Sequence, residues 1–151
     1  MLIFSIIALV AYLVLLLRFS NAIYYDKTTQ LKSYTPNISV IVAARNEEKN
    51  IPLLMEALIR QNYPINKYEI IIVNDRSLDD SRSLIESYQL NNNNIHLINI
   101  EKTPLGWGNK KWALTQAIES AQSDIILQTD ADCIPHENWL QTMGTYFENP
   151  D

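Results

Sequence analysis

The sequence is poor in cysteine and has no excess of basic residues, and both shortages narrow the range of functions. Cys133 is the only cysteine, so no disulfide can form within the chain and nothing indicates an oxidising compartment. We expect Cys133 to be a small buried side chain. Twelve lysines and arginines against seventeen acidic residues give a net charge of -5. This balance argues against nucleic-acid binding, which requires a basic face.

Charged residues are also missing from the first part of the chain. The stretch from Met1 to Leu17 has none. Together with the residues that follow it, this stretch predicts one transmembrane anchor over residues 1–25, because about 20 apolar residues cross a bilayer. A signal peptide is the alternative, since Ser20-Asn21-Ala22 resembles a cleavage site, although no basic residue precedes the apolar run. By the positive-inside rule we expect a cell-membrane protein with its domain in the cytoplasm, because basic residues follow the run: Arg18, Lys27 and Lys32.

Short apolar runs alternate with amphipathic stretches after a polar linker at residues 26–36. The runs predict strands at 38–44, 69–73, 95–100 and 125–129, and helical periodicity follows each of them. Strands that alternate with helices are typical of an α/β layered domain with a mostly parallel sheet, which we place at residues 37–151. Ligands of such sheets bind beyond the carboxyl ends of the strands.

Polar residues gather where these strands are expected to end. Asp75 ends the second strand, where a carboxylate can accept the imide N–H of a uracil ring. Lys110 follows a glycine-containing loop at a helix start and could add positive charge toward a phosphate, but the Walker spacing of a P-loop is missing. Asp130 and Asp132 end the fourth strand. Taken alone, each cluster is also explained as a solvated turn or a helix start, with Asn46 as a helix cap.

Together, the clusters resemble the N-terminal, nucleotide-binding part of a family 2 glycosyltransferase with the GT-A (Rossmann-like) fold. The resemblance runs from Pro36 to Asp151, and the combination of motifs is specific whereas each single motif is not. The matching segments are the opening strand and loop Val40–Glu47, the Asp-Asp-x-Ser variant Val73–Ser77, Lys110 with Ala113-Leu114, and the DxD motif Asp130-Ala131-Asp132.

The resemblance implies a role for each matching residue. Asp75 is expected to recognise uracil, and the base and ribose are expected to be lined by Ala44, Arg45 and Glu47. Lys110 and Asp130 complete the nucleotide-sugar site, and Asp130 and Asp132 are expected to hold Mg²⁺ or Mn²⁺. Two residues depart from the family pattern: Asn74 replaces the first aspartate of the Asp-Asp pair, and Asn109 stands where many relatives have glycine.

The implied function is metal-dependent, inverting transfer of a sugar from a nucleotide-sugar, specifically a UDP-sugar. The expected acceptor is lipid-linked, a glycolipid or a polysaccharide. Because relatives place the catalytic base beyond the DxD motif, we expect a domain that is incomplete at the C-terminus and inactive alone. Two alternatives remain open: a non-catalytic, membrane-tethered nucleotide-binding module, and a phospho-receiver domain. A receiver needs an acidic pair after its first strand, where this chain has Arg45-Asn46-Glu47-Glu48.

Overall fold

The computed structural model describes residues 4, 9–18 and 34–148, which belong to two compact units divided after residue 32. In the first unit, residues 9–18 are helical and expose their apolar side chains, among them Leu9, Leu13 and Leu17. Within the described residues, no helix has both the length and the apolar character needed to cross a membrane. The remainder of the predicted anchor, at 1–3, 5–8 and 19–25, and linker residues 26–33 lie outside the described residues.

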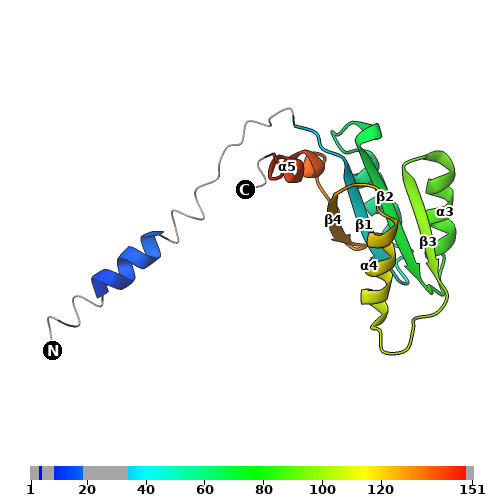
Figure 1. Cartoon of the computed structure of the whole chain (residues 1–151), viewed down its shortest axis with the longest axis horizontal. Helices are drawn as coiled ribbons and strands as arrows, with labels where there is room; N and C mark the ends of the chain where they lie inside the picture. Colours follow the sequence, from blue (N-terminus) through cyan, green and yellow to red (C-terminus); the bar gives the residue numbers. More distant parts are fainter. Residues whose placement is uncertain (1–3, 5–8, 19–33, 149–151) are drawn as a thin grey trace. The chain divides into compact units, whose positions relative to one another are not determined.

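The described part of the second unit contains one sheet of four strands, all parallel (Figure 1). Its spatial order is β3-β2-β1-β4, so β1 is flanked by β2 and β4. The predicted α/β architecture with a mostly parallel sheet is confirmed. The strands are β1 (Ile38–Ala44), β2 (Tyr68–Asp75), β3 (Ile95–Ile100) and β4 (Ile125–Asp130).

Helices follow the strands along the chain. The α-helices are α2 (Ile51–Ile59), α3 (Ser81–Asn91), α4 (Asn109–Ser120) and α5 (Trp139–Thr145), and a short 3₁₀ helix, η1 (Ile65–Lys67), precedes β2. Pro52 stands in the first turn of α2, where the missing N–H costs no intrahelical hydrogen bond. Helix α3 ends in a run of asparagines, which are poor helix formers and favour turns.

Each face of the sheet has its own apolar core because successive side chains of a strand point to opposite sides. On one face, Val40 and Ile70 pack with residues of α2, α3 and α5. On the other, Ile41 and Ile71 pack against α4. β1 and β2 are therefore buried on both faces, which explains their nearly continuous runs of isoleucine and valine.

Helix α4 connects the two edges of the sheet. It leaves β3, packs over β2 and β1, and leads into β4. Ala113 and Ala117, both fully buried, lie one turn apart and form its contact with the sheet. Since the helix runs from the carboxyl ends of the strands to their amino ends, its first residues lie at the edge where β1, β2 and β4 terminate.

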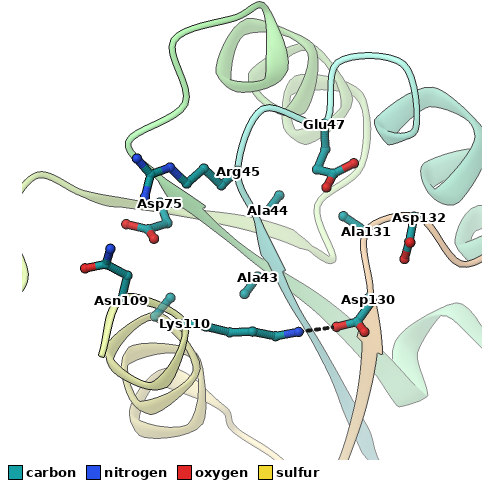
Figure 2. A pocket seen from close by; sticks show the side chains of 11 residues that line it. Ala43, Ala44, Arg45, Glu47, Asp75, Asn109, Lys110, Asp130, Ala131 and Asp132 are labelled. Carbon is teal, nitrogen blue, oxygen red and sulfur yellow. Dashed lines mark hydrogen bonds and ion pairs between the residues drawn. The ribbon is translucent and has the colours of Figure 1, made fainter. Parts of the chain in front are cut away.

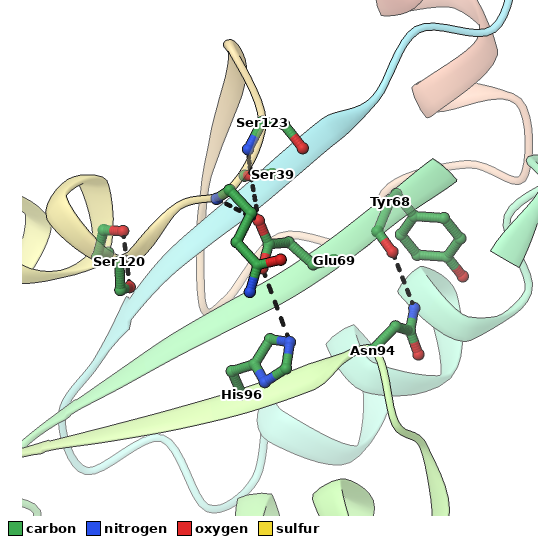
Figure 3. A network of polar contacts seen from close by, with 9 residues as sticks. Ser39, Tyr68, Glu69, Asn94, His96, Ser120 and Ser123 are labelled. Atoms are coloured by element: carbon green, nitrogen blue, oxygen red, sulfur yellow. Dashed lines mark hydrogen bonds and ion pairs between the residues drawn. The ribbon is translucent and has the colours of Figure 1, made fainter. Parts of the chain in front are cut away.

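A buried polar network holds the opposite, amino-terminal edge (Figure 3). Glu69 of β2 accepts hydrogen bonds from Ser39 Oγ of β1 at 2.5 Å and from the backbone N–H of Gln122 at 2.7 Å. Ser39 Oγ in turn accepts one from the backbone N–H of Ser123 at 3.1 Å. His96 Nε2 of β3 lies 3.7 Å from the same carboxylate. This network joins the turn between α4 and β4 to the centre of the sheet.

Glu69→Ala should lower the free energy of unfolding by about 1–3 kcal/mol, because it leaves the buried hydroxyl of Ser39 and the N–H of Gln122 without their acceptor. Urea denaturation of the full chain measures the loss. Glu86→Ala is the matched control, since Glu86 pairs only across an exposed helix surface with Arg82, a contact worth about 0.3–0.5 kcal/mol. Equal losses for the two variants would contradict the assigned role of Glu69.

Candidate functional site

A cleft of about 390 Å³ lies at the carboxyl ends of β1, β2 and β4 (Figure 2). All the residues predicted for the nucleotide and metal sites line it: Ala44, Arg45, Glu47, Asp75, Lys110, Asp130 and Asp132. Four further residues complete the lining: Ala43, Asn109, Ala113 and Ala131. The structure thus brings the four sequence clusters together in one place.

The register of the parallel strands accounts for this convergence. Ala44 of β1 is paired with Asn74 of β2, so β2 ends on Asp75, one residue beyond the last pair. On the other side, Ala43 is paired with Asp130, the last residue of β4. Asp75 and Asp130 therefore end strands two positions apart, a spacing of about 10 Å between strand axes. The small side chains at the end of β1 leave the space between them open.

The loops after β1 and β2 are joined by hydrogen bonds. Asn46 adopts a left-handed backbone conformation, with φ of 56°, which asparagine tolerates better than most residues. Its backbone N–H donates to Ser77 Oγ at 3.0 Å, and its Oδ1 accepts from the N–H of Leu78 at 2.8 Å. The interpretation of Asn46 as a helix cap is wrong, because its side chain binds the neighbouring loop instead.

Glu47 lies in the same junction. Its backbone N–H donates to Ser81 Oγ at 2.8 Å, and its Oε2 accepts from Asn50 Nδ2 at 2.7 Å. The N-cap of α2 is Asn50, whose side chain makes no capping hydrogen bond. Glu47 is therefore held from both its backbone and its side chain at the margin of the cleft.

Asp75 is the buried acid of the cleft. Its side chain is 7% exposed, and its Oδ1 lies 2.8 Å from Arg76 Nε and 2.7 Å from Arg76 Nη2. Asn74, which departs from the family pattern, has a structural role: Nδ2 donates to Asn99 Oδ1 at 3.0 Å and Oδ1 accepts from the N–H of Ser77 at 3.3 Å. One amide thus ties β2 to β3 and supports the turn that follows Asp75.

Lys110 contacts Asp130 directly. Its Nζ lies 2.8 Å from Asp130 Oδ1, in a pair whose side chains are 62% and 53% exposed. The hydrogen bond to Asp130, and then the charge of that carboxylate, raise the pKa of Lys110. Figure 2 shows the lysine side chain extending from α4 across the cleft to the end of β4. The amine neutralises one of the two DxD carboxylates.

The DxD carboxylates suit a hard divalent cation. Asp130 and Asp132 are both exposed at the cleft, and Oδ2 of Asp130 is left free by the contact with Lys110. In the part of the chain that the structure describes, no cluster of three or more His, Cys, Asp or Glu side chains could hold a metal. Mg²⁺ binds through one or two carboxylates together with substrate phosphates and water, so two carboxylates fit. The expectation for the neighbouring Cys133 is wrong, because its side chain is exposed.

Sequence reasoning placed Ala44 in the site but did not name three other alanines of the cleft as lining residues: Ala43, Ala113 and Ala131. Ala43 lies on the strand face toward α4, and Ala113 follows Asn109 by four residues, on the same helical face. Ala131 is buried between the two carboxylates. Strand alternation and helical spacing predict which side of the sheet and helix these alanines face. They were not recognised because alanine only leaves space and carries no polar group that marks a site residue. Asn109 stood out only as a departure from the family pattern.

The fold is an open, parallel α/β domain with its cleft at the topological switch point of the sheet. The strand order runs from β3 through β2 to β1 and then changes direction to β4, and such domains bind ligands where the order reverses. Residues 39–151 match the family model described as Glycosyl transferase family 2. The chain therefore belongs to glycosyl transferase family 2, and the family resemblance drawn from the motifs is confirmed. The phospho-receiver alternative is not supported.

Characterised relatives have similar sequences over most of this chain. It is 31% identical to Glycosyltransferase AglE of Haloferax volcanii over 111 residues, which cover 74% of this chain and 35% of the relative. It is 30% identical to the Beta-monoglucosyldiacylglycerol synthase of Synechocystis sp. over 115 residues, 76% of this chain and 24% of the relative. The chain thus spans about a third or less of the length of these relatives.

Solved structures share the fold. S. aureus TarS 1-349 in complex with UDP has a TM-score of 0.65 and 27% identity, covering 74% of this chain and 32% of that one. The mannosyltransferase PcManGT from Pyrobaculum calidifontis, in complex with GDP-Man and Mn²⁺, has a TM-score of 0.70 and 25% identity, covering 90% of this chain and 40% of that one.

The junction between the two loops should weaken in acid. Burial raises the pKa of Asp79, but hydrogen bonds from Ser81 and the N–H of Glu48 outweigh this effect and leave the pKa below its ordinary value. A lowered pKa contributes stability above the unfolded-state pKa, and this contribution is lost as the pH falls through the lower folded-state value. Asp79→Asn should therefore lower the thermal midpoint at pH 7.

The measurement is a series of thermal melts between pH 7 and pH 2.5. We expect the difference between wild type and Asp79→Asn to shrink below about pH 4, where the aspartate of the unfolded chain becomes protonated. Asp124→Asn is the control, because Asp124 is an exposed residue outside the junction. A difference that stays constant down to pH 2.5 would exclude the ionised carboxylate as its source.

Proposed function

We propose that this chain is the nucleotide-sugar-binding part of a glycosyltransferase that uses a UDP-sugar. The observation that carries the proposal is the convergence of the family's nucleotide and DxD residues on one cleft at the switch point of the sheet. TarS in complex with UDP and PcManGT in complex with GDP-Man have similar folds, which supports nucleotide binding by this chain.

In this proposal the nucleotide lies across the end of β1. Asp75 accepts the imide N–H of uracil, and Ala44, Arg45 and Glu47 line the base and ribose. The diphosphate then faces Lys110 and the end of β4, about two strand spacings from Asp75. The alanines of β1 and α4 provide the space that a base and a sugar ring need.

Asp130 and Asp132 would hold Mg²⁺ or Mn²⁺, and the Mn²⁺ in the PcManGT complex supports a divalent ion. When bound, such an ion offsets the charge that develops on the diphosphate leaving group. Lys110 supplies a second positive charge from the start of α4. The proposed transfer is inverting, as the family resemblance implies.

The proposed acceptor is lipid-linked, a glycolipid or a polysaccharide, at a cell membrane. One relative is named for a glucosylated diacylglycerol, which supports a lipid acceptor. The uncharged run from Met1 to Leu17 and the exposed apolar side chains of residues 9–17 support a membrane anchor at residues 1–25, with the domain in the cytoplasm. A non-catalytic nucleotide-binding module remains the alternative, and sugar transfer by the whole protein distinguishes the two.

Titration with UDP tests the proposed site. Mn²⁺ should tighten UDP binding by wild type at least about tenfold, because Asp130 and Asp132 would hold the ion next to the diphosphate. Asp132→Ala should remove this effect of Mn²⁺. Asp75→Ala should lower the affinity for UDP in the presence of Mn²⁺. Isothermal titration calorimetry measures both. Asp124→Ala, at the opposite end of the sheet, should behave as wild type; metal-independent UDP binding by wild type would refute the metal role.

Replacement of Lys110 tests the position of the diphosphate. Lys110→Met should lower the affinity for UDP about tenfold and leave the affinity for uridine unchanged, because in this proposal the amine faces the phosphates and not the base. Lys111→Met is the matched control: the neighbouring amine lies 5.2 Å from the centre of the Trp107 ring and outside the cleft lining. Equal weakening of uridine and UDP by Lys110→Met would place the amine at the nucleoside instead.

A further inference from the structure

Arg76 leaves Asp75 with one free acceptor oxygen, and we propose that this makes the cleft select uracil over guanine. Arg76 is then a positioning residue that sets base specificity through Asp75. The inference rests on the proposed function, in which Asp75 contacts the base of the nucleotide.

The backbone at Arg76 is the first observation. Its φ is 54°, in the left-handed region where glycine has no steric cost and an L side chain does. The turn is supported by the hydrogen bond from the N–H of Ser77 to Asn74 Oδ1. Strained backbone conformations cluster at functional sites. An arginine where glycine would fit without strain indicates that the arginine side chain has a role here.

The second observation is where the guanidinium lies. Nε and Nη2 both approach the same oxygen of Asp75, Oδ1, at 2.8 and 2.7 Å. Nη2 is buried, and this carboxylate is its one charged partner among residues 34–148. Nε donates a hydrogen bond to Oδ1, and Nη2 is in ion-pair contact with the same oxygen without a hydrogen bond, so the guanidinium covers Oδ1. Oδ2 accepts no hydrogen bond from the described residues, so it remains available to accept one from a ligand.

One acceptor oxygen suits uracil and not guanine. Uracil presents a single N–H between two carbonyl groups, and this N–H needs one acceptor. Guanine presents a ring N–H next to an amino group, and a carboxylate satisfies such a pair with both of its oxygens. With Oδ1 already occupied, guanine would leave an N–H without an acceptor inside the cleft, which costs affinity. Cytosine has no ring N–H at the corresponding position and is rejected as well.

Arg76→Gly is the most informative variant, because it removes the guanidinium while suiting the left-handed backbone. The full chain is titrated with UDP and GDP in the presence of Mn²⁺, by calorimetry, and its thermal midpoint is measured in parallel. We expect the ratio of UDP to GDP affinity to fall by about tenfold or more as both oxygens of Asp75 become available, and the thermal midpoint shows whether the variant is folded.

Two variants accompany it. Arg82→Ala removes another arginine–carboxylate pair, an exposed one with Glu86 on α3, and should leave the ratio unchanged. Arg76→Lys keeps a positive charge without the two-pronged contact and should give an intermediate ratio. If Arg76→Gly fails to fold, the Arg76→Lys ratio decides alone: a wild-type ratio would overturn the inference, and a reduced one would support it.

The results separate this inference from the function on which it rests. Wild type that binds neither nucleotide, or Asp75→Ala that binds UDP as wild type does, would refute the proposed function itself. If Asp75→Ala weakens UDP while a folded Arg76→Gly keeps the wild-type ratio of UDP to GDP, the cleft binds as proposed and the role of Arg76 is wrong.

Discussion

Parallel pairing of β1 with both β2 and β4 is the constraint on which the cleft depends. Because all three strands point the same way, their carboxyl ends meet at one edge. The register then places Asp75 and Asp130 on either side of the two alanines that end β1. A slip of one residue in either pairing would turn the side chains of that strand to the opposite face, and the cleft would lose one of its carboxylates.

The acids of the cleft are held in different ways at its two sides. Asp75 is buried and shares one oxygen with Arg76, in a loop fastened to its neighbour through Asn46 and Ser77. Asp130 is exposed and meets Lys110 across open space. A buried ion pair is costly to break, whereas an exposed pair exchanges partners with little cost. The geometry is thus fixed where a base would be read and adaptable where phosphates would bind.

Most of the fold follows from the pattern of apolar residues, since the expected strands end within two residues of the observed ones. The family resemblance also identified the polar residues that line the cleft, apart from Asn109. Asn46 was misread because its partners, Ser77 and Leu78, lie more than 30 residues further along the chain, and no local pattern reveals such contacts. Likewise, the pairing of Lys110 with Asp130 depends on the path of α4 over the sheet, which residue spacing does not contain.

The network around Glu69 has a consequence for how this domain can change over evolutionary time. It ties the sheet together at the amino ends of the strands, while the ion pair of Lys110 and Asp130 at the other end is too exposed to contribute much to folding. Substitutions of Lys110 or Asp130 should therefore change the stability of the domain little. The phosphate side of the cleft can vary in this way without a change of fold, whereas the side of Asp75 cannot.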